Sequence, residues 1–151
     1  MVLIATQYTR FNFSLRIMKI VTKMLEEELY ESSTVDGIKA TIDMRALPLK
    51  KHQSPVEILL SSVAACGAVD IVVMLRKRKK TVLDFTIETE GTRRETPPRS
   101  LTAIHCRYII TSPDVTEEEL QKSAKLSLEK YCSVADSLKA EITFSVEVRR
   151  S

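Results

Sequence analysis

The stretch SPVEILLSSVAACGAVDIVVMLRKRK, residues 54–79, decides the fold. Ser54 is suited to cap a helix, Pro55 fits the first helical position, and Glu57 stands where a capping box places its acid. The residues that follow are apolar on nearly every side until Arg76. This pattern predicts a helix that lies mostly inside protein and runs to about Lys80.

The apolar part of this helix, residues 58–75, raises the question of a membrane span. It contains two serines, a glycine and an aspartate and has no aromatic belt, so a buried helix is favoured and no membrane partner is expected. The basic run RKRKK at 76–80 has no aromatic residues interleaved. We interpret it as a solvated helix end that complements the helix dipole, not as a nucleic-acid surface.

Strand patterns flank this helix on both sides. Three strands precede it, with a hairpin turn at Asp36-Gly37 and an apolar face from Ile38 to Met44, and three follow it. A second capping box, Thr116 with Glu119, begins a shorter helix that ends near Cys132. The order β-β-β-α-β-β-α-β predicts an α+β fold. The predicted strands are 18–28, 29–35, 38–45, 82–89, 101–111 and 141–149, and the second helix is expected to bury Leu120, Ala124, Leu128 and Tyr131.

Composition narrows the function. The chain has 151 residues, which suits one domain, and we expect an N-terminal extension at 1–17 followed by a domain at 18–151. The chain has three glycines and two histidines. The few glycines exclude a glycine-rich phosphate loop, and two histidines are too few to favour a histidine metal site. The net charge of +3 is too small to argue for nucleic acid. We therefore expect no metal, no organic cofactor and no nucleic-acid partner.

The three cysteines are Cys66, Cys106 and Cys132. Their number is odd and no C-x-x-C spacing occurs, so a disulfide framework and a zinc knuckle are both disfavoured and a reducing, cytoplasmic location is expected. Each one could be only a small core hydrophobe. Cys66 lies among small residues in the first helix and Cys132 ends the second, so the two could meet across the helix packing. Cys106 follows a strand alternation and is interpreted as core.

A thiol that reduces peroxides needs a thiolate at neutral pH, a group that manages the proton of the leaving oxygen, and a second thiol. Cys66 is too far from its helix start for the dipole to help, so an arginine must lower its pKa. Asp70, one turn later, opposes this unless it faces another partner, such as a basic side chain of a second subunit. The candidate arginines are Arg45, Arg93, Arg94 and Arg99.

These segments together resemble a known family. Residues 54–79 resemble the central helix of the OsmC/Ohr superfamily, the osmotically induced and organic-hydroperoxide-resistance proteins. KYCSVADSL at 130–138 is similar to its second-cysteine segment, and GTRRETPPRSLTAIHCRYIIT at 91–111 to its intervening hairpin. The KYCSV string and the Cys-x-x-x-Asp spacing are most similar to the YhfA-like branch.

The resemblance implies an OsmC-like fold with long central helices, an intertwined homodimer, and active sites at the subunit interface. By motif position Cys66 matches the peroxidatic cysteine and Cys132 the resolving one, and Arg45 falls near the position of the active-site arginine. Peroxidase members carry their catalytic acid directly after the proline of this helix, whereas Val56 stands there and Glu57 comes one residue later. Glu57 is therefore either the displaced acid or a helix cap.

Two functions of different classes follow. The first is thiol-dependent reduction of organic hydroperoxides in a stress response, with Cys66, Cys132, Arg45 and Glu57 as catalytic residues and an external dithiol as reductant. The second is a non-enzymatic dimer that binds a small apolar ligand or a partner at its interface.

Overall fold

The computed structural model describes residues 17–151, which divide into a smaller unit ending at His52 and a larger unit from Gln53 to Ser151. The N-terminal extension expected at 1–17 lies outside the described residues, apart from Ile17. The boundary placed at Met18 therefore stays a prediction.

The smaller unit is an antiparallel sheet in the order β1-β2-β3. Its strands are β1 (Ile20–Glu26), β2 (Leu29–Thr34) and β3 (Lys39–Asp43). Gly37 has a φ of 82° and its N–H donates to the Thr34 carbonyl, which confirms the hairpin turn at Asp36-Gly37. The expected apolar face of β3 is not buried, since Ile38 is 71% and Met44 53% exposed. Between residues 17 and 52 the unit is a single sheet, so no described element of this unit covers that face.

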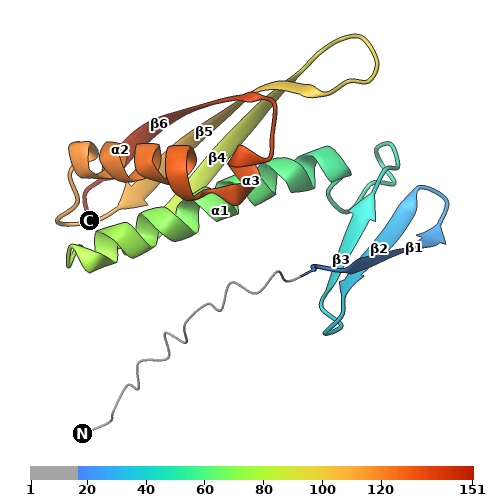
Figure 1. The fold of residues 1–151 in the computed structure, drawn as a ribbon, viewed down its shortest axis with the longest axis horizontal. Coiled ribbons are helices and arrows are strands. Elements are labelled where there is room, and N and C mark those ends of the chain that lie inside the picture. Colours follow the sequence, from blue (N-terminus) through green and yellow to red (C-terminus); the bar gives the residue numbers. More distant parts are fainter. Residues whose placement is uncertain (1–16) are drawn as a thin grey trace, which may run out of the picture. The chain divides into compact units, whose positions relative to one another are not determined.

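The larger unit contains a second three-stranded sheet in the order β4-β5-β6, with α1 (Pro55–Lys77) and α2 (Glu117–Leu126) on one of its faces (Figure 1). Its strands are β4 (Asp84–Arg93), β5 (Leu101–Thr111) and β6 (Glu141–Arg149). β4 and β5 are antiparallel, whereas β5 and β6 are parallel and joined through α2. The predicted α+β order is confirmed. β4 runs past Gly91 into the expected loop, because the absence of a side chain there lets Leu60 and Leu101 pack over the strand.

The helix α1 begins as predicted. The Ser54 N–H and hydroxyl both donate to the Glu57 carboxylate at 2.7 Å. The helix ends at Lys77, earlier than expected, and Lys79 then adopts a left-handed φ of 60°. The capping contacts fix the first turn of α1, the helix that carries Cys66 at its middle.

The sheet and α2 cover only one stripe of α1. The buried residues of this helix are Val63, Gly67, Ile71 and Leu75. Only 22% of its apolar 18-residue window is buried, and Val69 is 63% exposed, so the expectation of a mostly buried helix is wrong for the single chain. Its length and composition would allow it to cross a membrane, but the core helix of a soluble protein passes the same test, so this is weak evidence.

The second helical segment has three parts. The predicted capping box begins α2, with Thr116 Oγ1 accepting from the Glu119 N–H at 3.2 Å. A π-helical turn, η1 (Ser127–Tyr131), follows, and then a short α3 (Ser133–Asp136). Leu120 and Ala124 are buried as expected, whereas Tyr131 is 58% exposed. The wider π-helical turn shifts the later side chains off the α-helical face.

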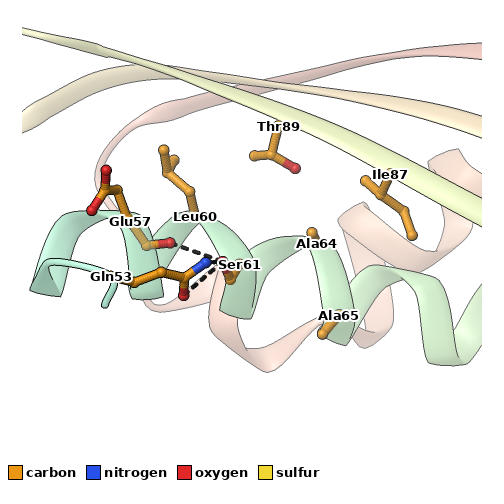
Figure 2. Close-up of a pocket in the computed structure, with 8 residues that line it drawn as sticks. All are labelled: Gln53, Glu57, Leu60, Ser61, Ala64, Ala65, Ile87 and Thr89. Carbon is orange, nitrogen blue, oxygen red and sulfur yellow. Dashed lines mark hydrogen bonds between the residues drawn. The ribbon is translucent and has the colours of Figure 1, made fainter. Parts of the chain in front are cut away.

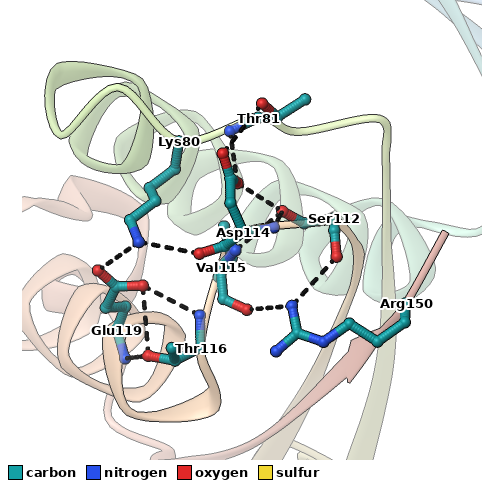
Figure 3. Close-up of polar contacts among 8 residues, drawn as sticks. All are labelled: Lys80, Thr81, Ser112, Asp114, Val115, Thr116, Glu119 and Arg150. Atoms are coloured by element: carbon teal, nitrogen blue, oxygen red, sulfur yellow. Dashed lines mark hydrogen bonds and ion pairs between the residues drawn. The ribbon is translucent and has the colours of Figure 1, made fainter.

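The basic end of α1 is held against the start of α2 (Figure 3). Lys80 Nζ donates to the Asp114 carbonyl at 2.8 Å and lies 3.0 Å from the Glu119 carboxylate. The Asp114 carboxylate accepts from the Thr81 N–H at 2.8 Å, and the Arg150 guanidinium donates to the Val115 carbonyl at 2.8 Å. Of the basic run, residues 76–79 are exposed, as expected for a solvated helix end, and Lys80 pairs internally.

Candidate active site

Cys66 and Cys132 lie together in the larger unit. Cys66 is half-buried in the middle of α1, and Cys132 is 2% exposed at the junction of η1 and α3. Burial, followed by the contact with the Cys66 thiol, raises the pKa of Cys132 from 9.0 to about 11. Cys132 therefore stays protonated at neutral pH.

The backbone around Cys132 is shaped by the π-helical turn. Its N–H donates to the Ser127 carbonyl at 2.8 Å, and its Sγ accepts from the Ala135 N–H at 3.4 Å, so the sulfur caps α3. π-Helical turns are common at functional sites. A cavity of about 260 Å³ adjoins this turn and is lined by Lys130, Tyr131, Cys132 and Asp136, among others. Cys132 thus lies at the wall of a cavity although only 2% of the residue is exposed.

Gly67, next to Cys66, marks the closest approach of α1 to β5. A Cβ built on Gly67 would lie 2.6 Å from the Tyr108 hydroxyl oxygen, so only glycine leaves room for that group. The Ser127 hydroxyl donates to the Gly67 carbonyl at 3.0 Å and lies 3.5 Å from the Asp70 carboxylate. Within this chain the Ser127 hydroxyl is a partner of Asp70, and the suggested basic side chain of a second subunit stays a prediction.

Tyr108 points from β5 into this region. Its ring lies 6.0 Å from that of Phe85 and 6.4 Å from that of Phe144, centroid to centroid. The residue is fully buried, and among residues 17–151 its hydroxyl makes no hydrogen bond of good geometry. Its one hydrogen-bonding neighbour there is the Cys106 thiol, a weak acceptor. Burial raises the pKa of Tyr108, and the neighbouring thiols Cys106, Cys132 and Cys66 raise it further.

Cys106 is fully buried on β5, which confirms its interpretation as strand core. Burial raises the pKa of its thiol. It is paired across the strands with Thr89 and precedes Tyr108 by two residues, so both side chains lie on the face that α1 covers. All three cysteines therefore surround the Tyr108 hydroxyl. Sequence reasoning did not single out Tyr108 as a site residue, although the shared strand face of Cys106 and Tyr108 was a usable signal.

Three of the four candidate arginines, Arg45, Arg93 and Arg94, have other side-chain partners in the structure. Arg45 belongs to the smaller unit, where its Nε and Nη2 donate to the Asp43 carboxylate at 2.9 Å each. This ion pair holds the pKa of the buried Asp43 well below its usual range. Arg93 and Arg94 donate to the carbonyls of Arg99 and Pro98 and so stabilise the β4–β5 loop. The role of Arg45 toward Cys66 stays a prediction.

Glu57 caps α1 and also borders a pocket of about 450 Å³ between α1 and β4 (Figure 2). The pocket has apolar walls and a polar rim. Its lining residues are Gln53, Glu57, Leu60, Ser61, Ala64, Ala65, Ile87 and Thr89. The capping role of Glu57 is therefore present in the structure, and an additional role as an acid stays a prediction. Within residues 17–151, no cluster of three or more His, Cys, Asp or Glu residues could hold a metal ion.

A fold with two three-stranded sheets, a long apolar helix bearing one thiol and a second thiol brought against it defines a class of protein. The model of the OsmC-like protein family matches residues 49–147, and the chain belongs to that family. Protein YhfA of Escherichia coli strain K12 is 38% identical over 100 residues, which cover 65% of this chain and 75% of YhfA.

Solved structures show the same fold. An OsmC-like protein from Mycoplasma pneumoniae superposes with a TM-score of 0.77 at 20% identity, covering 89% of this chain and 99% of that one. The organic hydroperoxide resistance protein OhrB of Bacillus subtilis superposes with a TM-score of 0.60 at 13% identity, covering 90% of this chain and all of that one. At these identities the two likenesses concern the fold.

Proposed function

We propose that the protein reduces organic hydroperoxides with the thiols of Cys66 and Cys132. The observation that carries this proposal is the contact between a half-buried thiol on α1 and a buried thiol at the start of α3. Membership of the OsmC-like family supports it, and so does the fold shared with a protein named for resistance to organic hydroperoxides.

The reaction divides into three balanced steps. The Cys66 thiolate attacks the terminal oxygen of the hydroperoxide, the O–O bond breaks, and the alkoxide takes a proton and leaves as an alcohol. Cys66 becomes a sulfenic acid. The Cys132 sulfur then attacks the Cys66 sulfur, and the two cysteines form a disulfide while the sulfenic oxygen leaves as water. An external dithiol reduces this disulfide by thiol–disulfide exchange and is itself oxidised.

The environments of the two thiols fit these roles. Cys132 has a pKa of about 11 and is nearly inaccessible, so it is a poor first nucleophile and a suitable second one. Its contact with Cys66 supports the pairing of these two sulfurs in a disulfide. In this scheme Arg45 supplies the cation that favours the Cys66 thiolate, and Glu57 contributes chiefly by fixing the first turn of α1.

The proposed active form is a cytoplasmic homodimer. The exposed apolar surface supports a dimer, because Val69 on α1 is exposed and so are Ile38 and Met44, which flank β3. Pairing with a second copy would bury these surfaces in an isologous interface. Sedimentation velocity at micromolar concentration tests this proposal, and a stable species near 17.1 kDa would contradict it.

The pocket between α1 and β4 favours a second candidate function, the binding of a small apolar ligand without catalysis. Its walls are formed by Leu60, Ala64 and Ile87, and its rim is polar. The volume of about 450 Å³ lies in the range of small-molecule sites. In this case the thiols would be inert toward peroxides.

A peroxide titration separates the two functions. The fully reduced protein is mixed with one equivalent of cumene hydroperoxide per chain, and free thiols are counted against time. Loss of two thiols per chain, abolished by Cys66→Ser and unaffected by Cys106→Ala, supports the peroxidase. If the thiols react with the hydroperoxide no faster than those of the unfolded chain, the peroxidase proposal is refuted and the ligand-binding function is favoured.

A further inference from the structure

The Tyr108 hydroxyl is in an unusual position for a core tyrosine. A buried hydroxyl normally finds a hydrogen-bond partner, because leaving it without one sacrifices its solvation. Tyr108 is fully buried, and no partner of good geometry is present among the described residues. Phenylalanine would fill the aromatic cluster with Phe85 and Phe144 equally well. Packing therefore does not explain why this position carries a hydroxyl group.

The position of this hydroxyl points to the cysteines. It lies against Gly67, whose missing Cβ would otherwise be 2.6 Å away, and Gly67 directly follows Cys66 in α1. Cys106 shares its strand face, and Cys66 and Cys132 both contribute to the electrostatic environment of the phenol. Among the described residues the hydroxyl therefore has only a thiol, that of Cys106, as a weak hydrogen-bonding neighbour, and it faces the region where the proposed reaction creates a new oxygen.

We infer that the Tyr108 hydroxyl donates a hydrogen bond to the oxygen that Cys66 acquires on oxidation. This inference rests on the proposed function. Reduced sulfur, including that of Cys106, is a weak acceptor, whereas a sulfenate oxygen is a strong one, so oxidation supplies the strong acceptor that the hydroxyl lacks. When Cys132 attacks the Cys66 sulfur, the S–O bond breaks and the oxygen leaves with its bonding electrons. A hydrogen bond from Tyr108 stabilises the negative charge that develops on this oxygen, which takes a proton to become water.

The phenol is suited to this role because burial keeps it protonated. Its pKa is raised above the usual value, so it is a donor throughout the pH range in which proteins work. Tyr108 in this role touches the reacting oxygen and is a catalytic residue for disulfide formation, not for the first attack on the hydroperoxide. The two steps can therefore be separated in experiment.

The variant Tyr108→Phe removes one oxygen and leaves the aromatic packing in place. Tyr131→Phe is the matched control, because Tyr131 is exposed and adjoins Cys132. After one equivalent of cumene hydroperoxide, trapping with dimedone and non-reducing digestion follow the sulfenic acid and the disulfide. In Tyr108→Phe we expect an unchanged rate of Cys66 oxidation, disulfide formation slowed about tenfold or more, and accumulation of sulfenic acid. An unchanged rate of disulfide formation would overturn the inference.

A second arm does not depend on peroxidase activity. In a Cys106→Ala/Cys132→Ser background, one equivalent of hydrogen peroxide converts Cys66 to its sulfenic acid, and the pH dependence of its reaction with dimedone gives the sulfenic acid pKa. A hydrogen bond from Tyr108 lowers that pKa, so Tyr108→Phe should raise it, and a merely structural tyrosine would leave it unchanged. If the parent protein forms no disulfide with cumene hydroperoxide, the proposed function fails and this arm alone decides the role of Tyr108.

Discussion

Replacing Gly67 by alanine tests how closely α1 packs on β5. A new Cβ would lie 2.6 Å from the Tyr108 oxygen, well inside contact distance, while the next atoms, Tyr108 Cζ and a Leu128 methyl carbon, are 3.6 Å and 3.8 Å away. Glycine to alanine inside a helix normally stabilises by about 1 kcal/mol. Overpacking a buried site costs about 1–3 kcal/mol. We therefore expect Gly67→Ala to be neutral or to lower stability by up to about 2 kcal/mol, despite the better helix former.

The decisive comparison is the double variant Gly67→Ala/Tyr108→Phe. Without the hydroxyl the nearest atoms are at ordinary contact distances, so the double variant should be more stable than Gly67→Ala by about 1–3 kcal/mol. Urea unfolding of both single variants and the double variant gives the coupling energy. Ala65→Gly, at an exposed position of the same helix, calibrates the propensity difference. If Gly67→Ala alone gained the full propensity benefit, the close approach would be refuted.

Three further predictions concern other parts of the chain. Ser54→Ala should lower the free energy of unfolding by about 1 kcal/mol in urea titrations, because it removes part of the cap of α1. The Arg45 guanidinium holds the pKa of Asp43 below its usual value, so the ion pair stabilises the fold above about pH 4, and this stabilisation is lost as the pH falls further. The stability of Asp43→Asn to unfolding should therefore depend less on pH in the acid range. The pKa of Cys132 is raised, so the unfolded chain ionises first and stability should fall between pH 9 and about 11, a decline that Cys132→Ala should reduce.

Local patterns predicted those elements whose ends are set by local chemistry. The strands at 101–111 and 141–149 match the structure, since their alternating residues face one covered side. Both capping boxes begin their helices as expected, because a cap depends on residues only three positions apart. The pairing of two thiols from distant segments was also predicted, and the structure places Cys132 in contact with Cys66.

The remaining features depend on contacts that no local pattern carries. The π-helical turn that exposes Tyr131 inserts into an otherwise regular helix, and no periodicity marks it. The closeness of Gly67 to Tyr108 arises from the packing of α1 across β5, elements far apart in the chain. Arg45 pairs with Asp43, and this ion pair competes with the expected role of Arg45 as the cation beside Cys66. Strand alternation places the two side chains on the same face but does not predict that they form an ion pair.

The most direct test of the central claim is the identity of the first disulfide. Reduced protein is treated with a single equivalent of cumene hydroperoxide, quenched by alkylation, digested without reductant and analysed by mass spectrometry. The proposed mechanism predicts one dominant linked peptide pair that joins Cys66 to Cys132, with Cys106 alkylated only after unfolding. Recovery of Cys66 and Cys132 as free thiols, or a disulfide that links two chains through other cysteines, would contradict it.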